Sequence, residues 1–241
     1  GHVLTSVLQD KTEPVHKVSI IPRGFSGGAT HYLLSDKNNY SRQYLEQILV
    51  TLMGGRAAEE LVFNDLTTGA GNDIERCTDI AKKMICAWGM SDKIGPMTIG
   101  KDQGEVYLGK EILSRDIYSD DTAKLVDSEI RNLIHKSHSK ALDLLKTHNE
   151  LMDALAIKLL EVETLTTEEI FNTILDTVSD NLKPMIEKKF QQALELRFEY
   201  SAKKTESNIE GFHNVDTDEH KTSTNIEIED DTYTSNDKDT S

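Results

Sequence analysis

Apolar residues recur at three- and four-residue intervals along most of this chain, and that spacing constrains its fold more than any other feature. From Leu45 to Leu61, and again from Ile74 to Trp88, the apolar side chains fall on one face of a helix with about 3.6 residues per turn. The same spacing returns in later segments: Val126–Leu145, Glu150–Leu160, Glu168–Leu175 and Leu182–Phe198. We therefore predict a mainly α chain that folds as a helical bundle.

Polar residues mark where several of these helices begin. Asn72, with Glu75 three residues later, is typical of an N-cap and its capping-box partner. Ser119 is predicted to cap the long helix, and Thr166 with Glu169 has the spacing of a second capping box.

Two adjacent glycines, Gly54 and Gly55, lie inside the first long helical pattern. Each costs a helix about 1 kcal/mol relative to alanine. We expect the pair to interrupt the helix, and a neighbouring helix or loop that approaches the backbone closely to offset the cost.

A small β-hairpin is predicted near the N-terminus. Val15–Ile21 and Ala29–Leu34 are short β-like runs, separated by the Pro22-Arg23-Gly24 break. One strand of the hairpin could be an exposed sheet edge that pairs with the extended backbone of a substrate. Alternatively, it is an ordinary edge strand covered by neighbouring elements. A further short strand is possible at Glu105–Leu108.

Composition excludes some classes of function. The net charge is −15, and no cluster of lysine and arginine is present to bind phosphates, so we assign no nucleic-acid role. Cys77 and Cys86 do not form a CxxC pair, which favours a reducing compartment. No membrane span or signal peptide is recognisable, so this segment is expected to be soluble.

Two residues are candidates for chemistry, although each also has a simpler explanation. His2 could be an exposed or locally bonded histidine. Asp73 could simply complement the dipole of the helix that it begins. Because Asn72 and Glu75 already serve that helix start, Asp73 is free to point elsewhere.

Several segments together resemble the FtsH family of ATP-dependent zinc metalloproteases. They match in order and with similar spacing: GHVL from Gly1, PVHKVSIIPRG from Pro14, TLMGGRAAEEL from Thr51, TGAGNDI from Thr68, WGMS from Trp88, GEVYLG from Gly104 and SDDTA from Ser119. The resemblance runs from residue 1 to about Leu175. It implies a peptidase domain over 1–178. Apolar spacing predicts an amphipathic helix over 179–204, and the polar, acidic composition predicts a disordered tail over 205–241.

The resemblance implies a zinc site. His2 would be the second histidine of the His-Glu-x-x-His motif, and Asp73 the third protein ligand. The first histidine and the general-base glutamate would precede Gly1, so we expect this fragment to be inactive alone. Glu59 would accept a hydrogen bond from a ligating imidazole, although a carboxylate on the helix surface is equally compatible. No other histidine has a spacing that suggests a ligand.

The resemblance also implies the role of the intact protein. It would be a homo-hexameric endopeptidase of the inner membrane, with the peptidase on the cytoplasmic side, degrading unfolded and membrane proteins. ATP would be used by an upstream module, because this chain has no Gly-x-x-x-x-Gly-Lys-Ser/Thr phosphate loop. The alternative is a non-catalytic helical oligomerisation domain.

Overall fold

The structure, a computed structural model, describes residues 1–22, 27–33, 39–100 and 119–211. The chain divides into two units, Gly1–Ser201 and Ala202–Ser241. The contacts described below lie within the first unit, and of the elements only the helix Lys183–Gly211 continues into the second. Its elements run in the following order: α1 His2–Val7, β1 Val15–Ser19, β2 Ala29–Tyr32, α2 Arg42–Phe63, the 3-10 turn Thr68–Ala70, α3 Gly71–Lys82, the π-helical turn Lys83–Ala87, α4 Asp120–Thr147, α5 Asn149–Val162, β3 Thr164–Thr166, α6 Thr167–Thr177 and α7 Lys183–Gly211. The predicted mainly α fold is confirmed.

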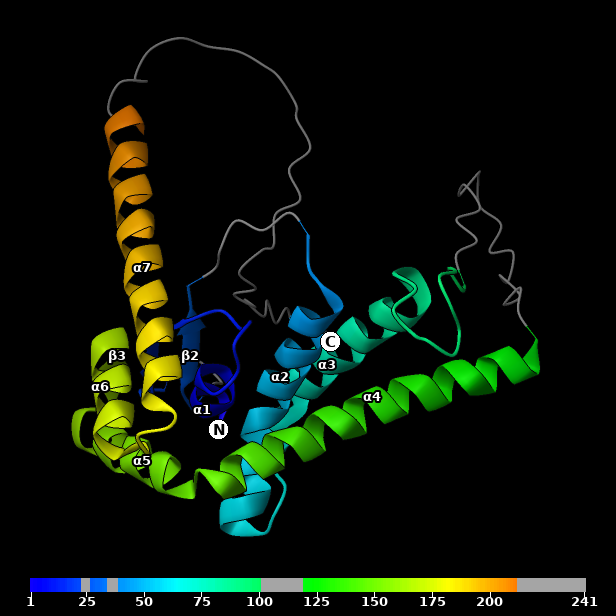
Figure 1. The fold of residues 1–241 in the computed structure, drawn as a ribbon, viewed down its shortest axis with the longest axis horizontal. Coiled ribbons are helices and arrows are strands. Elements are labelled where there is room, and N and C mark those ends of the chain that lie inside the picture. Colours follow the sequence, from blue (N-terminus) through cyan, green and yellow to red (C-terminus); the bar gives the residue numbers. More distant parts are fainter. Residues whose placement is uncertain (23–26, 34–38, 101–118, 212–241) are drawn as a thin grey trace, which may run out of the picture. The chain divides into compact units, whose positions relative to one another are not determined.

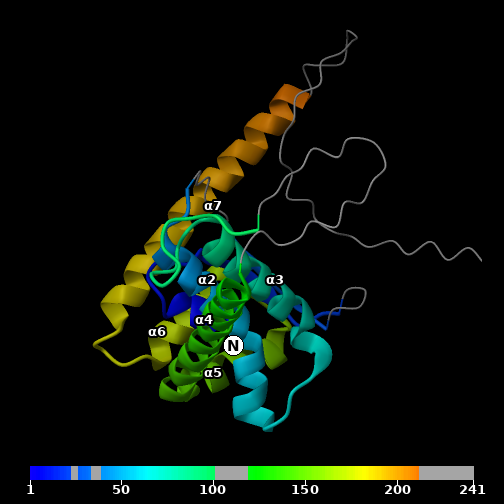
Figure 2. The same cartoon turned by 90° about the vertical axis from the view of Figure 1, so that its right-hand side faces the viewer.

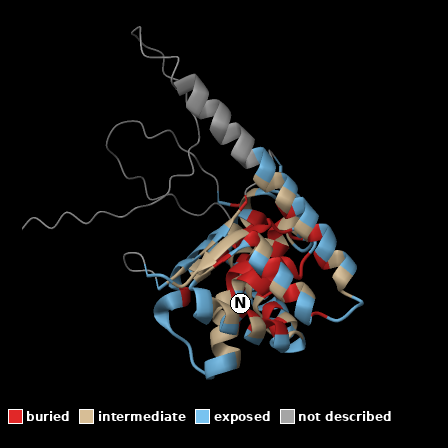
Figure 3. Ribbon diagram, turned by 90° about the vertical axis from the view of Figure 1, so that its left-hand side faces the viewer, coloured by how far each residue is buried: buried red, intermediate tan, exposed pale blue. Residues whose placement is uncertain are grey.

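Helix α2 is the centre of the helical part. It packs against α1, α3 and α4, and α2, α3 and α4 lie side by side (Figures 1 and 2). Leu49, Val50 and Met53 on α2 are buried, together with Ala141 and Leu145 of α4. Buried residues gather where α1 meets the surrounding helices and the sheet (Figure 3).

The glycine pair does not break α2, which runs unbroken from Arg42 to Phe63. That part of the prediction was wrong, whereas the expected close neighbour is present and is α1. A Cβ on Gly54 would stand 2.5 Å from Oγ1 of Thr5 and 3.1 Å from the backbone of Gly1. Glycine at this position lets the two helices cross almost backbone to backbone.

The start of α3 differs from the prediction. Asn72 is not its N-cap, because α3 begins at Gly71 directly after the 3-10 turn and has no side-chain cap. The cap lies further upstream, where Oγ1 of Thr67 accepts from the amide of Gly69. The 3-10 turn and the helix form one continuous helical segment, so the first free amides are those of the turn.

The other two predicted caps are confirmed. The Ser119 hydroxyl accepts from the amide of Thr122 at the start of α4. Thr166 and Glu169 form a complete capping box at the start of α6. The helix predicted from the apolar spacing between Ile74 and Trp88 is formed by α3 and the π-helical turn that follows it. Trp88 itself is 47% exposed and does not join the core.

The predicted hairpin is part of a three-stranded antiparallel sheet in the order β2-β1-β3. In β1, Lys17 pairs with His31 of β2 on one side and with Thr166 of β3 on the other. Strand β3 was not predicted, because three residues are too short to show an alternating pattern. The possible strand at Glu105–Leu108 lies outside the described residues.

Helix α7 extends beyond its predicted end. It runs from Lys183 to Gly211, so the first residues of the predicted disordered tail are helical, and 212–241 lie outside the described part. Phe190 of α7 stacks on Phe171 of α6 with ring centroids 5.0 Å apart. The proposed division at 178 and 204 remains a prediction. Among the helices described, none is long and apolar enough to span a bilayer.

Candidate metal centre

His2 and Asp73, the two predicted ligands, are brought together by the fold. Nε2 of His2 lies 3.0 Å from Oδ2 of Asp73, although the residues are 71 positions apart in the chain. His2 is the first residue of α1 and Asp73 lies in the first turn of α3. Both helices pack on α2, which therefore sets the distance between their N-terminal ends.

The imidazole of His2 lies directly on Gly55 of α2. A Cβ at Gly55 would stand 2.4 Å from Cε1 and 3.0 Å from Nδ1 of the ring. Real Cβ atoms essentially never come this close, so only glycine leaves room for the ring in this position. The sequence predicted that a neighbour approaches the glycine pair closely. It did not indicate that this neighbour is the imidazole of His2, the candidate ligand.

Glu59, the third predicted site residue, contacts the loop that leads to Asp73. Its two oxygens accept from the amide and the hydroxyl of Thr67, at 3.2 and 2.9 Å. A hydrogen bond from the imidazole of His2 to the carboxylate of Glu59 is not among the contacts of the described residues. The carboxylate holds the segment between α2 and α3, and its role toward a ligating imidazole stays a prediction.

Tyr32, at the end of β2, was not predicted as a site residue. Its Oη is buried and has no hydrogen-bond partner among the described residues. Burial raises the pKa of the Tyr32 phenol, and the negative charge of Asp73 raises it further. Tyr32 therefore brings a neutral hydroxyl into the neighbourhood of Asp73, a position that no spacing in the sequence could indicate.

Comparison with known proteins decides the family. The sequence pattern of Peptidase family M41 matches residues 1–174, which is more than two thirds of the chain. The chain belongs to peptidase family M41. The match ends within α6 and before α7 begins.

Curated relatives of this M41 chain carry the name ATP-dependent zinc metalloprotease FtsH. One from Magnetococcus marinus is 42% identical over 194 residues, covering 80% of this chain and 29% of the relative. Another from Myxococcus xanthus is 45% identical over 172 residues, covering 70% of this chain and 27% of the relative. A third from Thermotoga maritima is 42% identical over 172 residues, covering 70% of this chain and 28% of the relative. The M41 chain thus spans less than a third of the length of these relatives.

The residues present fit part of a zinc site. Imidazole nitrogen and carboxylate oxygen are both zinc ligands, and two ligands of one tetrahedral zinc lie about 3.3 Å apart. The 3.0 Å between His2 and Asp73 is close to that spacing, and their side chains are 27% and 32% exposed, so solvent reaches the pair. Within the described ranges no cluster of three histidine, cysteine, aspartate or glutamate residues occurs. That His2 and Asp73 are two members of a ligand set stays a prediction.

Among the described residues, no other histidine completes a three-residue metal cluster with this pair. His138 of α4 faces Glu60 of α2 at 3.1 Å, without the alignment of a hydrogen bond. Burial lowers the pKa of His16 and of His148, which favours the neutral ring at each position. His31 is exposed on β2.

Proposed function

We propose that this M41 chain is the peptidase part of an ATP-dependent, membrane-anchored zinc endopeptidase that degrades unfolded and membrane proteins. The observation that carries the proposal is the convergence of His2 and Asp73 from two different helices. An ordinary surface ion pair would not need a bare glycine beneath its histidine, whereas an imidazole held in one orientation as a ligand would.

Each residue of the pair has a defined task. Nε2 of His2 and Oδ2 of Asp73 would hold the metal, since these are the atoms that face each other. When bound, zinc lowers the pKa of a water molecule to about 7 and polarises the scissile carbonyl. A further histidine ligand and the general-base glutamate would come from positions ahead of His2 in the intact protein.

The sheet offers a place for an extended substrate. Within the described part of the chain, β2 pairs with β1 alone, so its other edge is available for a peptide backbone. β2 ends at Tyr32, whose phenol lies in the field of Asp73, so a peptide added along β2 would run toward the pair. Backbone pairing of this kind depends little on side chains, which suits unfolded substrates.

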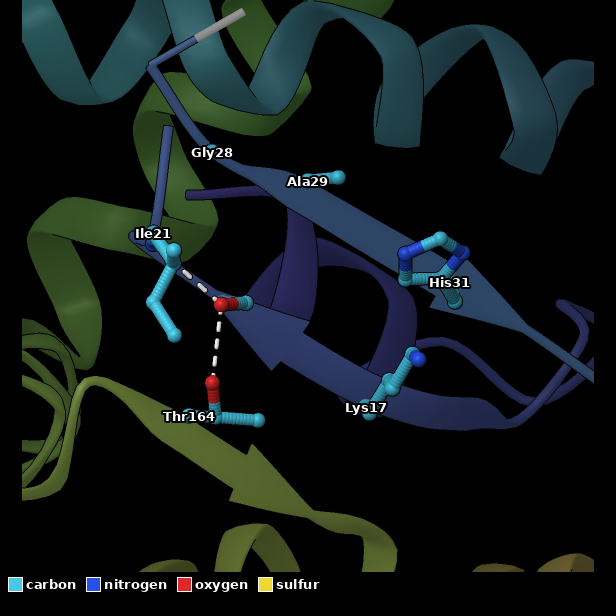
Figure 4. Close-up of a pocket in the computed structure, with 7 residues that line it drawn as sticks. Lys17, Ile21, Gly28, Ala29, His31 and Thr164 are labelled. Carbon is cyan, nitrogen blue, oxygen red and sulfur yellow. Dashed lines mark hydrogen bonds between the residues drawn. The ribbon is translucent and has the colours of Figure 1, made fainter. Parts of the chain in front are cut away.

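A shallow pocket lies on the same sheet, across the three strands. Lys17 of β1 and His31 of β2 lie side by side on its wall, and Thr164 closes the other side (Figure 4). The Ser19 hydroxyl is 2.8 Å from Oγ1 of Thr164 and accepts from the amide of Ile21. This small pocket, lined by both polar and apolar residues, would accept a short side chain of the bound peptide.

The larger assembly is part of the same proposal. The names of the relatives state ATP dependence and zinc, and their extra length leaves room for an ATPase module and a membrane anchor. We propose a homo-hexamer at the inner membrane with this domain on the cytoplasmic side, where ATP drives unfolded chains to the metal centre.

The test uses the intact protein, including the ATPase module. Zinc content and ATP-dependent casein cleavage are measured for the wild type, His2→Ala, Asp73→Asn and the control Asp79→Asn, an exposed carboxylate on the same helix as Asp73. We expect His2→Ala and Asp73→Asn to lose zinc and cleavage, and Asp79→Asn to keep both. A wild-type protein that forms hexamers but binds no zinc would refute the proposal and favour a non-catalytic oligomerisation domain.

A further inference from the structure

Lys189 is a buried lysine on α7, outside the part of the chain that matches the family. Only 4% of the residue is exposed. Its ammonium donates to the carbonyl oxygens of Ser6 and Gln9, and to Oγ1 of Thr12 at 2.6 Å. All three acceptors lie at or just beyond the C-terminal end of α1, the helix that begins with His2.

Two of these acceptors are backbone carbonyls, at or just beyond the end of a helix, where the helix itself cannot supply every partner. The last carbonyls of a helix have no partner within it, and burial away from water makes an unmet carbonyl costly. Burying an ammonium is costly too, and burial lowers the pKa of Lys189 to about 7, while Asp10 and Glu13 oppose that shift. The carbonyl of Ser6 also accepts from the amide of Gln9 and from the hydroxyl of Thr12. The ammonium of Lys189 therefore joins a hydrogen-bond network at the end of α1, and this network provides the oxygen acceptors that a buried ammonium needs.

The segment after α1 is also tied to α2 on its other side. Nε2 of Gln9 donates to the carbonyls of Thr5 and Gln47, at 2.7 and 3.1 Å. The side chain of Gln47 in turn binds Oδ1 of Asp10 and the amide of Lys11. The end of α1 is therefore held between α2 and the ammonium from α7.

A displacement of the C-terminal end of α1 would be transmitted to His2 at its N-terminal end. The helix has six residues, and at about 1.5 Å of rise per residue Ser6 lies only about 6 Å along the axis from His2. A helix this short is not stable in isolation, so tertiary contacts set its position. A shift of its C-terminal end would therefore move the imidazole relative to Gly55 and Asp73.

We propose that Lys189 is a positioning residue of the metal centre, which clamps the C-terminal end of α1 and thereby holds His2 opposite Asp73. This inference rests on the proposed role of His2 and Asp73 as metal ligands. Helix α7 would then do more than cover the core. Its Lys189 would hold the end of α1 that is opposite His2.

The test is a Co²⁺ titration of the intact protein, followed by the visible absorption of the bound ion. We expect Lys189→Met to weaken Co²⁺ binding about tenfold and to change the absorption bands, because an imidazole that is poorly held is a weaker ligand. Lys188→Met, the exposed neighbour on α7, should leave affinity and spectrum unchanged.

A second control separates positioning from stability. Ile186 is fully buried on α7 and has no polar group, so Ile186→Ala loosens the helix without removing a contact to the carbonyls of α1. We expect Ile186→Ala to lower the melting temperature but to keep wild-type affinity for Co²⁺. Equal losses of affinity in Ile186→Ala and Lys189→Met at equal losses of melting temperature would overturn the inference.

The remaining outcomes are also decisive. Wild-type affinity and spectrum in Lys189→Met refute the inference and leave the proposed function intact, whereas a wild-type protein that binds no Co²⁺ refutes both. Should Lys189→Met not fold, Thr12→Val removes one acceptor and keeps the ammonium. We then expect altered Co²⁺ bands, and an unaltered spectrum overturns the inference.

Discussion

The ring of His2 rests against Gly55 so closely that a single methyl group at Gly55 would lie 2.4 Å from its Cε1 atom. The glycine pair of α2 thus has two tasks. Gly54 admits the backbone of α1, and Gly55 admits the imidazole that faces Asp73. The helix accepts the lower propensity of two glycines because α1 fills the space that they leave.

Replacing Gly55 by alanine should displace the imidazole. We expect Gly55→Ala to weaken zinc binding at least about tenfold, even though alanine favours the helix. Zinc affinity is measured by competition with a chelator. The matched control is Gly71→Ala, a helical glycine where a Cβ meets nothing within 4 Å. It should bind zinc normally and be more stable by about 0.5–1 kcal/mol, and normal zinc binding in Gly55→Ala would contradict the close contact.

Removing the carboxylate of Glu59 should loosen the loop before Asp73. A double-mutant cycle with Glu59→Ala and Thr67→Val should give a coupling of about 0.5–1 kcal/mol in the free energy of unfolding, because Thr67→Val removes the hydroxyl that donates to Glu59. Urea denaturation measures it, and Glu75→Ala, an exposed carboxylate on α3, serves as the control. Coupling of Glu59 to His2 and not to Thr67 would instead support the predicted contact with the imidazole.

Lys189 should make stability depend on pH. Its folded pKa of about 7 lies below the ordinary 10.5, so between these values the unfolded chain binds a proton that the folded chain does not. The free energy of unfolding therefore gains a contribution that rises with pH in this window, by at most about 1.4 kcal/mol per pH unit. Lys189→Met should remove that contribution.

Urea denaturation at several pH values from 7 to 9.5 checks this prediction. The difference between the wild type and Lys189→Met isolates the lysine, because every other titrating group is common to both proteins. Lys188→Met should retain the wild-type slope. An identical slope in Lys189→Met would show that the ammonium keeps its proton throughout the window.

The capping box of α6 should contribute to stability without affecting the metal centre. Thr166→Ala removes the hydroxyl that accepts from the amide of Glu169, at a cost of about 1 kcal/mol. Thermal unfolding measures the loss, while zinc affinity should stay unchanged. Thr173→Ala, within the same helix and half-buried, should change stability by less than about 0.5 kcal/mol. A loss in Thr173→Ala as large as in Thr166→Ala would argue against the cap.

Much of the fold could be read from local patterns. The apolar spacing indicated the helices, and the caps at Ser119 and Thr166 were found because a cap depends only on residues three positions apart. The cap at Asn72 was wrong for a related reason: a 3-10 turn precedes α3, and no local pattern distinguishes a helix start from the continuation of such a turn. Strand β3 was missed because it is stabilised by pairing with β1, more than 140 residues away in the chain.

The sequence by itself determined the helical class, the family resemblance and the identity of His2 and Asp73 as candidate ligands. Only the tertiary structure decided that Nε2 of His2 and Oδ2 of Asp73 lie 3.0 Å apart. It also decided that Gly55 leaves room for the imidazole ring and that Lys189 binds the other end of α1. Helix periodicity and capping act over a few residues, so they are visible in the sequence. The contacts that position His2 join residues between 53 and 183 positions apart, and such contacts depend on how α2 and α7 pack, which no local pattern specifies.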